Sequence, residues 1–322
     1  MDLSLAAQNL ISPPVLFFAL GVAAALARSE LAIPEAVAKA LSLYLMLAIG
    51  FKGGVAAGDH GLGFDLLAVI GAAVVLSFAI PLLAFGLLDA TTKLKRVDKA
   101  AIAAHYGSIS IVTFIAATAA LDAAAIAYPG IMVAAAAAME VPAIMTALFL
   151  ASRGTGKDSG RGTMPWREVT LNGSVVLLVG AFVIGMATGR TGYQDVAPFI
   201  EAPFKGVLCL FLLDMGLVAG RELRQVGRTL TPALLVFGLY MPLLGGVIGA
   251  LVALLIGLEG GGIAMLSVLT ASASYIAVPA AMRLTLPEAK PSLYLTLSLA
   301  VTFPFNLTIG IPFYIALAAW LS

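Results

Sequence analysis

The sequence contains few of the residue types on which metalloenzymes and disulfide-linked domains depend. Only 11% of its 322 residues are charged, and it has one cysteine, Cys209, and two histidines, His60 and His105. One cysteine excludes a disulfide framework and a cysteine-based zinc site, and two histidines cannot supply a zinc triad. The net charge of +1 leaves no basic face for nucleic acid. We therefore expect no enzyme of these classes, no organic cofactor and no nucleic-acid partner.

Apolar residues, by contrast, make up 61% of the chain, and the mean hydropathy is +1.06. A soluble domain of this length could not bury so much apolar surface, so the composition predicts an all-α polytopic membrane protein. No basic leader precedes the first apolar run, and we expect no cleaved signal peptide. Counting apolar segments of about 20 residues predicts ten spans. They lie near 12–28, 34–56, 65–88, 99–120, 129–151, 171–189, 200–220, 231–256, 260–282 and 292–320.

Basic residues are distributed unevenly between the two sides that these spans define. All but three of the 18 Lys and Arg residues fall in loops after odd-numbered spans, and the exceptions are Lys52, Arg190 and Lys205. Because basic loops mark the cytoplasmic side, the pattern predicts a multi-pass protein of the cell (inner) membrane. Both termini are then expected on the outer, periplasmic side.

The two halves of the chain resemble each other. Residues 152–168 are rich in Gly, Ser and charge and are expected to form a short cytoplasmic linker. It would separate a first repeat at 1–151, with spans one to five, from a second at 169–322, with spans six to ten. An odd number of spans in each half inverts the second relative to the first. The sequence therefore predicts two inverted five-helix repeats.

Spans four and nine are interrupted at matching places by short polar stretches. Irregular backbone at membrane depth is tolerated only around a buried cavity, and paired interruptions of this kind indicate a midplane transport site. Two helix N-termini converging there would bind a small anion without a buried Lys or Arg. The alternative is that Gly, Ala and Ser simply allow close helix packing. The candidate substrate-binding residues are Gly107, Ser108, Ser110, Ala271, Ser272, Ser274 and Tyr275.

A carboxylate in span five is the candidate for cation binding. Glu140 precedes Pro142 in MEVP, and an acid at membrane depth marks an ion path or a hydrogen-bonded pair. Thr302 and Asn306 in span ten offer further oxygen ligands, so the three residues form the expected sodium site. A neutral Glu140 bonded to another helix is the alternative, and its protonation leaves proton coupling open.

Three further residues are secondary candidates. His105 and Tyr106 precede the first break and could contact substrate or close the site, whereas Asp214 in span seven could act in a gate or in ion binding. A Ser–His protease using His105 is disfavoured, because a pair on one segment lacks convergent catalytic geometry. A passive channel is a further alternative to a transporter.

Six motifs in order are similar to the sodium-dependent bicarbonate transporter family known from cyanobacteria. The resemblance covers nearly the whole chain from Ser12 onward. The motifs are GFKGG (50–54), HYGSIS (105–110), MEVPAIMTAL (139–148), LDMGLVAG (213–220), ASASYIAVPAAMR (271–283) and LPEAKPSLYLTLS (286–298).

The resemblance implies a gate domain from spans one, two, six and seven and a core domain from spans three to five and eight to ten. It also implies a homotrimer, sodium-driven bicarbonate uptake by alternating access, and a small cytoplasmic regulatory protein as a possible partner. In this chain Glu140 replaces the aspartate of the family pattern, and Tyr275 stands where the cyanobacterial form has an acid.

We therefore expect a transporter of a small anion, with bicarbonate as the first candidate. Because the second break is more apolar than the family pattern, the alternative is a monocarboxylate or other organic anion, with proton coupling as an option.

Overall fold

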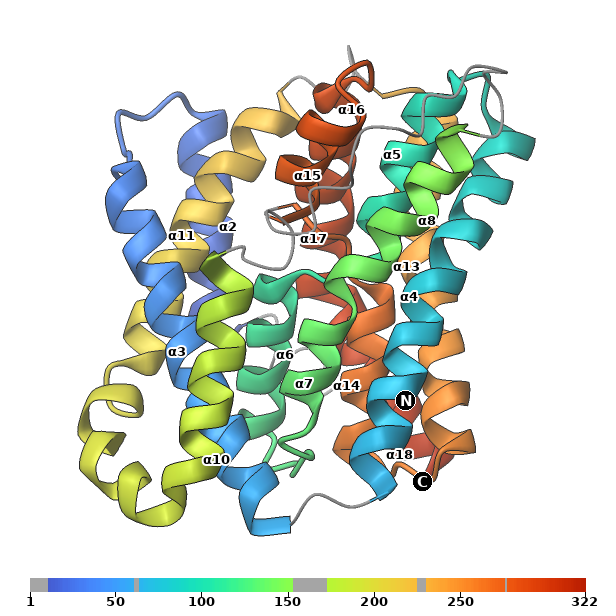
Figure 1. Cartoon of the computed structure of the whole chain (residues 1–322). Coiled ribbons are helices and arrows are strands. Elements are labelled where there is room, and N and C mark those ends of the chain that lie inside the picture. Colours follow the sequence, from blue (N-terminus) through green and yellow to red (C-terminus); the bar gives the residue numbers. More distant parts are fainter. Residues whose placement is uncertain (1–10, 61–63, 153–172, 225–229, 276) are drawn as a thin grey trace.

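The computed structural model describes residues 11–60, 64–152, 173–224, 230–275 and 277–322, and helices account for 83% of these residues (Figure 1). No strand occurs in these residues. An apolar chain in lipid must satisfy its backbone hydrogen bonds internally, which a helix does within one segment. The all-helical prediction is confirmed, and the predicted linker lies outside the described residues except for Ser152.

The first half of the chain contributes seven helices, two pairs of which divide a predicted span. They are α2 (Pro13–Leu26), α3 (Glu35–His60), α4 (Phe64–Thr91), α5 (Arg96–Gly107), α6 (Ile111–Ala123), α7 (Met132–Ala138) and α8 (Glu140–Ser152). The second half begins with α10 (Gly173–Ile200), α11 (Phe204–Leu223), α13 (Pro232–Leu255), α14 (Gly260–Ala271) and α15 (Ala277–Thr285). It ends with α16 (Pro291–Leu295), η1 (Thr296–Thr302), α17 (Phe303–Phe305), η2 (Asn306–Gly310) and α18 (Ile311–Leu321).

Seven helical segments of the described chain are long and apolar enough to cross a membrane. The helices Pro13–Leu26 and Gly260–Ala271 are apolar but shorter. Each of the ten predicted spans contains helix, but ten membrane crossings and the inverted repeat remain predictions. The seven segments are Glu35–Gly58, Leu66–Thr91, Arg96–Ala123, Met132–Ser152, Val176–Ile200, Pro232–Leu255 and Pro291–Leu321.

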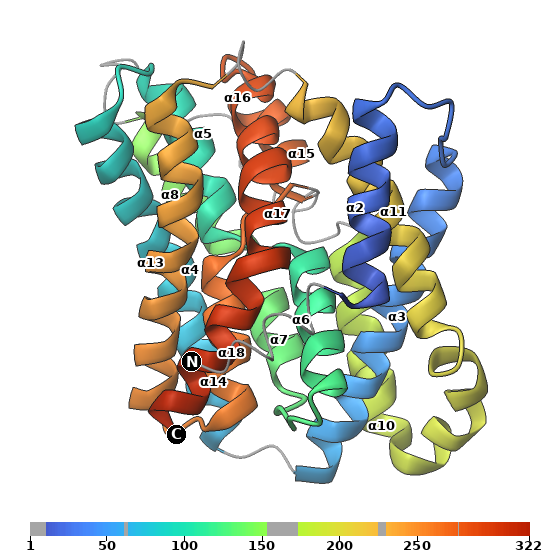
Figure 2. The ribbon, with the colours of Figure 1, turned by 180° about the vertical axis from the view of Figure 1, so that it is seen from behind.

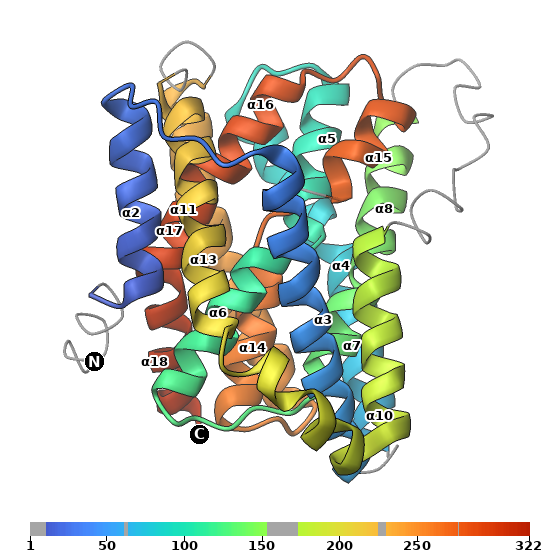
Figure 3. The same cartoon turned by 90° about the vertical axis from the view of Figure 1, so that its left-hand side faces the viewer.

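Two closely packed helix pairs form one side of the molecule: α2 lies along α11, and α3 lies along α10 (Figure 3). Glycine allows both approaches. A Cβ on Gly54 of α3 would lie 1.9 Å from the Phe182 carbonyl oxygen of α10. A Cβ on Gly216 of α11 would lie 2.1 Å from the Phe18 carbonyl oxygen of α2. Small residues at both crossings let the backbones touch, as in other membrane helix pairs.

The remaining helices divide at mid-height. Figure 1 shows α5, α8 and α16 in the upper half, with α6, α7 and α14 below them. Seen from behind, α13 runs the full height beside α14 and α18 (Figure 2). The helix breaks therefore lie at the level where a bilayer midplane is expected.

Three local features differ from the sequence expectation. The segment predicted at 171–189 continues to Ile200, with a kink at Gly189, where φ is +56°. The span containing Glu140 is divided, since α7 ends at Ala138 and α8 begins at Glu140. The last span contains two π-helical segments, Thr296–Thr302 and Asn306–Gly310, on either side of Pro304. Proline lacks an N–H and disrupts the regular α-helical ladder, which accounts for the irregularity near Pro304.

Candidate functional site

The two predicted breaks are present as short extended segments. Helix α5 ends at Gly107, and α6 begins at Ile111, with Ser108 at φ −93° and ψ 171° between them. Helix α14 ends at Ala271, where Ser272 takes φ −79° and ψ 157°. Both segments contain hydroxyl residues, which can satisfy backbone groups that a broken helix leaves unpaired.

One serine in each break accepts a hydrogen bond from an N–H of the helix that follows. Ser110 Oγ accepts a hydrogen bond from the Thr113 N–H (3.2 Å), and Ser274 Oγ accepts one from the Val278 N–H (3.4 Å). The Ser110 bond is the N-cap bond expected of serine. Ser274 lies three residues before Ala277, the first residue of α15, so its bond supports the start of that helix without the same N-cap position.

The two breaks are in direct contact although they lie far apart in the sequence. The Ser110 N–H donates to Ser272 Oγ (2.9 Å), and the Ser274 N–H donates to the His105 carbonyl oxygen (2.8 Å). Ser272 Oγ in turn donates to the Leu269 carbonyl (2.9 Å). Ser108, Ser110, Ser272 and Ser274 are all buried. The structure thus brings together the serines that the sequence selected from the two halves.

Gly107 is required at its position for packing. A Cβ there would lie 2.1 Å from Pro81 Cγ of α4 and 3.0 Å from Ala143 Cβ of α8. A proline ring cannot move aside as a flexible side chain can. The glycine therefore lets α5 end against α4 and α8.

Two N–H groups remain at the start of α6 after its serines are used. The first turn of a helix leaves about four N–H groups without helical partners. Ser272 and Ser110 take up two of them, and no hydrogen bond joins the Ile111 or Val112 N–H to any described residue. Together with the helix dipole, these groups provide a setting suited to an anion.

Two buried hydroxyl groups at the same place have no hydrogen-bond partner among the described residues. Thr113, in the first turn of α6, is 1% exposed, and Tyr275, in the second break, is 9% exposed. The Ser110 hydroxyl is close enough to the Tyr275 hydroxyl to interact with it. Buried hydroxyls are normally bonded, so the Thr113 hydroxyl is the one available to a ligand. Sequence reasoning selected Tyr275 and missed Thr113, although a hydroxyl in the first turn after an N-cap serine was a usable signal.

Glu140 lies next to the first break. Its side chain is 5% exposed, and Glu140 Oε2 accepts a hydrogen bond from Ser108 Oγ (2.7 Å). The neighbouring helix α4 is fixed to this region by Ser77, whose Oγ donates to the Met139 carbonyl (2.6 Å). A bonded, buried carboxylate of this kind is consistent with either an ion ligand or a neutral acid.

Thr302 and Asn306 make hydrogen bonds to groups other than Glu140. Thr302 Oγ1 donates to the Gly238 carbonyl (2.8 Å) and therefore accepts from the Tyr106 hydroxyl (2.6 Å), because it has one hydrogen. Asn306 Nδ2 donates to the Ala271 carbonyl (2.9 Å) at the end of α14. No cluster of three His, Cys, Asp or Glu residues able to hold a metal occurs in the described chain. A sodium ion would therefore depend on hydroxyl, amide and carbonyl oxygens beside Glu140.

The secondary candidates fall into two groups. His105 and Tyr106 are buried beside the first break. The His105 ring stacks on Tyr294 with centroids 4.4 Å apart, its Nδ1 bonds the Ala101 carbonyl (2.6 Å), and its Nε2 has no partner among the described residues. Asp214 is also buried, but it belongs to α11 in the other helix group. Asp214 thus lies on a different helix pair from the breaks, and its role in a gate or in ion binding stays a prediction.

The contacts between breaks, the capped helix start and the buried carboxylate are the parts expected of an ion-coupled anion transporter. A family model described as the Na+-dependent bicarbonate transporter superfamily matches residues 13–319. The chain belongs to this superfamily. It is accordingly a multi-pass membrane transporter, and the family predicted from the motifs is confirmed. Comparison with curated proteins finds no match.

Proposed function

We propose that this transporter takes up a small anion, with bicarbonate as its first candidate, coupled to sodium by alternating access. Superfamily membership supports the transport of bicarbonate with sodium. The observation that carries the proposal is the start of α6, where the Ile111 and Val112 N–H groups and the Thr113 hydroxyl have no partner among the described residues. No catalytic step is assigned to the chain.

The anion is proposed to bind where the two breaks meet. The Ile111 and Val112 N–H groups donate to its oxygens, and the serine hydroxyls at 108, 110, 272 and 274 and the Tyr275 hydroxyl surround it. Helix-end N–H groups and hydroxyls bind an oxyanion without a buried positive charge. A neutral site releases the anion more readily than a paired Lys or Arg would, which suits a carrier.

Sodium is proposed to bind at Glu140, with Thr302 and Asn306 from the other half of the chain. Ser108 connects this carboxylate to the first break through a 2.7 Å hydrogen bond. Ligation of one ion by all three residues requires Thr302 and Asn306 to exchange their present partners, Gly238 and Ala271. Shared contact through Ser108 would couple the affinity for the cation to that for the anion.

Alternating access is proposed to occur between two helix groups. The tightly packed pairs α2–α11 and α3–α10 supply the gate domain, and the other helices supply the core domain. The groups meet at Phe18 and Phe303, whose rings are 5.3 Å apart, and at Thr296 Oγ1, which donates to Glu222 Oε2 (2.8 Å). Helix α7 also packs against α3 and α10, and η1 packs against α11. These contacts can change without breaking either helix pair. Homotrimer formation, an inner-membrane location and binding of a small cytoplasmic regulator are included in the proposal from the family resemblance.

Uptake of labelled bicarbonate into proteoliposomes, with and without an inward sodium gradient, tests the proposal. We expect saturable uptake that requires the gradient. Equal uptake under both conditions would contradict sodium coupling, and non-saturating uptake would indicate a channel.

A second candidate cargo is a monocarboxylate. Ile109, Val278 and Tyr275 are buried around the breaks, so the walls are more apolar than bicarbonate requires. Thermal stabilisation of the purified protein by acetate or propionate in sodium, compared with bicarbonate, discriminates between the two. Stabilisation by the carboxylates alone would favour the second candidate.

A further inference from the structure

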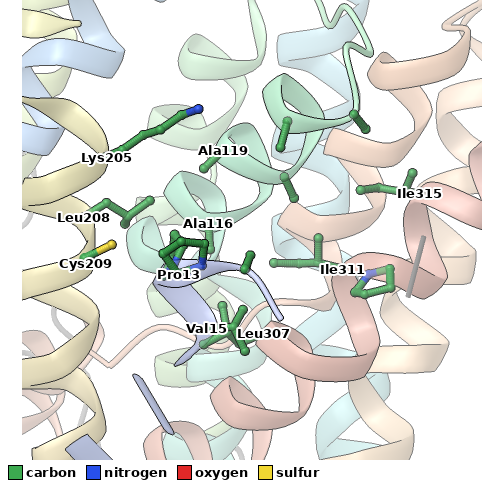
Figure 4. A pocket seen from close by; sticks show the side chains of 16 residues that line it. Pro13, Val15, Ala116, Ala119, Lys205, Leu208, Cys209, Leu307, Ile311 and Ile315 are labelled. Atoms are coloured by element: carbon green, nitrogen blue, oxygen red, sulfur yellow. The ribbon is translucent and has the colours of Figure 1, made fainter. Parts of the chain in front are cut away.

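A separate cavity of about 300 Å³ lies between the start of α2, helices α6 and α11, and the η2–α18 segment. Figure 4 shows Val15 and Leu307 at one end and Ala119 and Lys205 toward the other. The cavity thus lies between two helices proposed for the gate domain and two segments proposed for the core domain. Its size is at the lower end of pockets that hold small molecules.

Lys205 is the only charged residue among the 16 that line the cavity. The rest of the lining is mainly alanine, proline and branched apolar side chains, with Ser12 and Cys209 as its other polar members. The cavity therefore combines an apolar interior with one ammonium group.

The Lys205 ammonium is exposed and has no ion-pair partner within the described residues. Asp122, at the end of α6, attracts both Lys205 and Lys52. The charge of this aspartate is therefore shared between two lysines, and neither forms an ion pair with it in the described chain. Basic residues are also scarce at this end of the chain's predicted spans, which makes an unpaired lysine there notable on electrostatic grounds.

We propose that this cavity binds a monocarboxylate with a short aliphatic tail. The carboxylate pairs with Lys205 at the rim, and the tail lies between the alanines of α6 and the apolar residues of α11 and α18. Bicarbonate has no tail to fill the apolar interior, and a neutral amphiphile gains nothing from the ammonium. Because the ligand contacts both helix groups, it holds them in one relative position and slows transport.

The position of Cys209 allows the site to be tested in the unmodified protein. Cys209 is the only cysteine in the sequence, and it lines the cavity one turn of α11 beyond Lys205. The rate of its modification by N-ethylmaleimide therefore reports on occupancy of this cavity alone. The full-length protein in lipid nanodiscs is incubated with butanoate, hexanoate or octanoate, with octanamide as the uncharged match of octanoate.

We expect octanoate to slow modification of Cys209 at least fivefold. The concentration needed should fall about fourfold for each added methylene until the cavity is full, because each buried CH₂ contributes roughly that factor in affinity. Octanamide and bicarbonate should protect poorly. The variant Lys205→Arg should retain protection, whereas Lys205→Gln should require at least fivefold more octanoate, and Ala120→Leu should lose protection by filling the cavity.

Equal protection by octanamide, or an unchanged octanoate requirement in Lys205→Gln, would overturn the proposal and indicate a lipid-filled crevice. If Cys209 does not react with N-ethylmaleimide, thermal unfolding provides a second measurement. Octanoate should raise the unfolding temperature of the wild-type protein and not that of Lys205→Gln. Equal shifts, or none in either protein, would also overturn it. Neither measurement depends on the transported anion. This proposal can therefore fail while bicarbonate transport is demonstrated, and bicarbonate transport can fail while this proposal holds.

Discussion

Thr113 and Thr118 lie on the same helix but differ in the use of their hydroxyl groups. Thr118 Oγ1 donates to the Ile115 carbonyl (2.8 Å), whereas Thr113 Oγ1 has no partner in the described chain. Both side chains are buried. The difference follows from position, since Thr113 lies in the first turn of α6 beside the second break. The proposed anion would accept a hydrogen bond from this unused donor.

The variant Thr113→Val should therefore weaken anion binding and leave the fold intact. A hydrogen bond to a charged group contributes about 1.5–3 kcal/mol, so the KM for the transported anion should rise roughly tenfold or more. Uptake into proteoliposomes measures this. Thr118→Val is the matched control, and an equal effect in both variants would assign Thr113 a structural role.

Glu140 differs from the serines because its charge can change without a change in shape. In Glu140→Gln the hydrogen bond to Ser108 can be kept, but the negative charge that attracts a cation is lost. We expect sodium to lose its effect on uptake and on thermal stability. The control is Glu222→Gln, near the end of α11, where Glu222 accepts a hydrogen bond from Thr296. This variant should keep sodium dependence. A fully sodium-dependent Glu140→Gln variant would place the cation elsewhere.

At the level of helices, the breaks after Gly107 and Ala271 lie where the sequence predicts them, because residues at the breaks themselves interrupt the helices. Gly107 and the serines interrupt apolar segments, and Ser110 and Ser274 each bond an N–H of the helix that follows. The break before Glu140 and the π-helical segments near Pro304 were missed. Pro142 and Pro304 are evident in the sequence. Where the helical hydrogen bonds are interrupted, however, depends on neighbouring helices, as in the contact of Ser77 with Met139.

Packing of α3 on α10 makes a quantitative prediction. The variant Gly54→Ala places a Cβ 1.9 Å from the Phe182 carbonyl oxygen, which forces the helices apart. Overpacking of this kind costs about 1–3 kcal/mol. Thermal unfolding in detergent should show a lower midpoint. Gly180→Ala on α10 is the control, because its Cβ meets no atom within 4 Å, and its midpoint should be nearly unchanged.

For the whole molecule, the ends of α2 and α11 and the starts of α5 and α16 gather at the upper end in Figure 1, and the C-terminus lies at the lower end. Arg28, Lys93, Lys95, Arg224 and Lys290 lie in the described loops at this upper end. Because basic residues mark the cytoplasmic side, we predict that this end faces the cytoplasm and that the C-terminus lies outside.

Orientation can be measured with single cysteines in a Cys209→Ser background. An impermeant maleimide should label Ser322→Cys in intact cells, because the C-terminus is predicted to face outward. Ser29→Cys, after α2, should be labelled only after the cells are permeabilised. The reverse pattern would invert the proposed topology.

The sequence alone determined that this protein is helical and membrane-embedded, where its polar interruptions lie and which family it resembles. These properties follow from composition and local order, because apolar runs and capping serines act over a few residues. The tertiary structure decided which polar groups meet: Ser110 with Ser272, Ser108 with Glu140, and Asn306 with the end of α14. It also left the Thr113 hydroxyl without a partner among the described residues and placed Lys205 at a cavity. Such contacts depend on how distant helices cross, and no short stretch of sequence encodes that geometry.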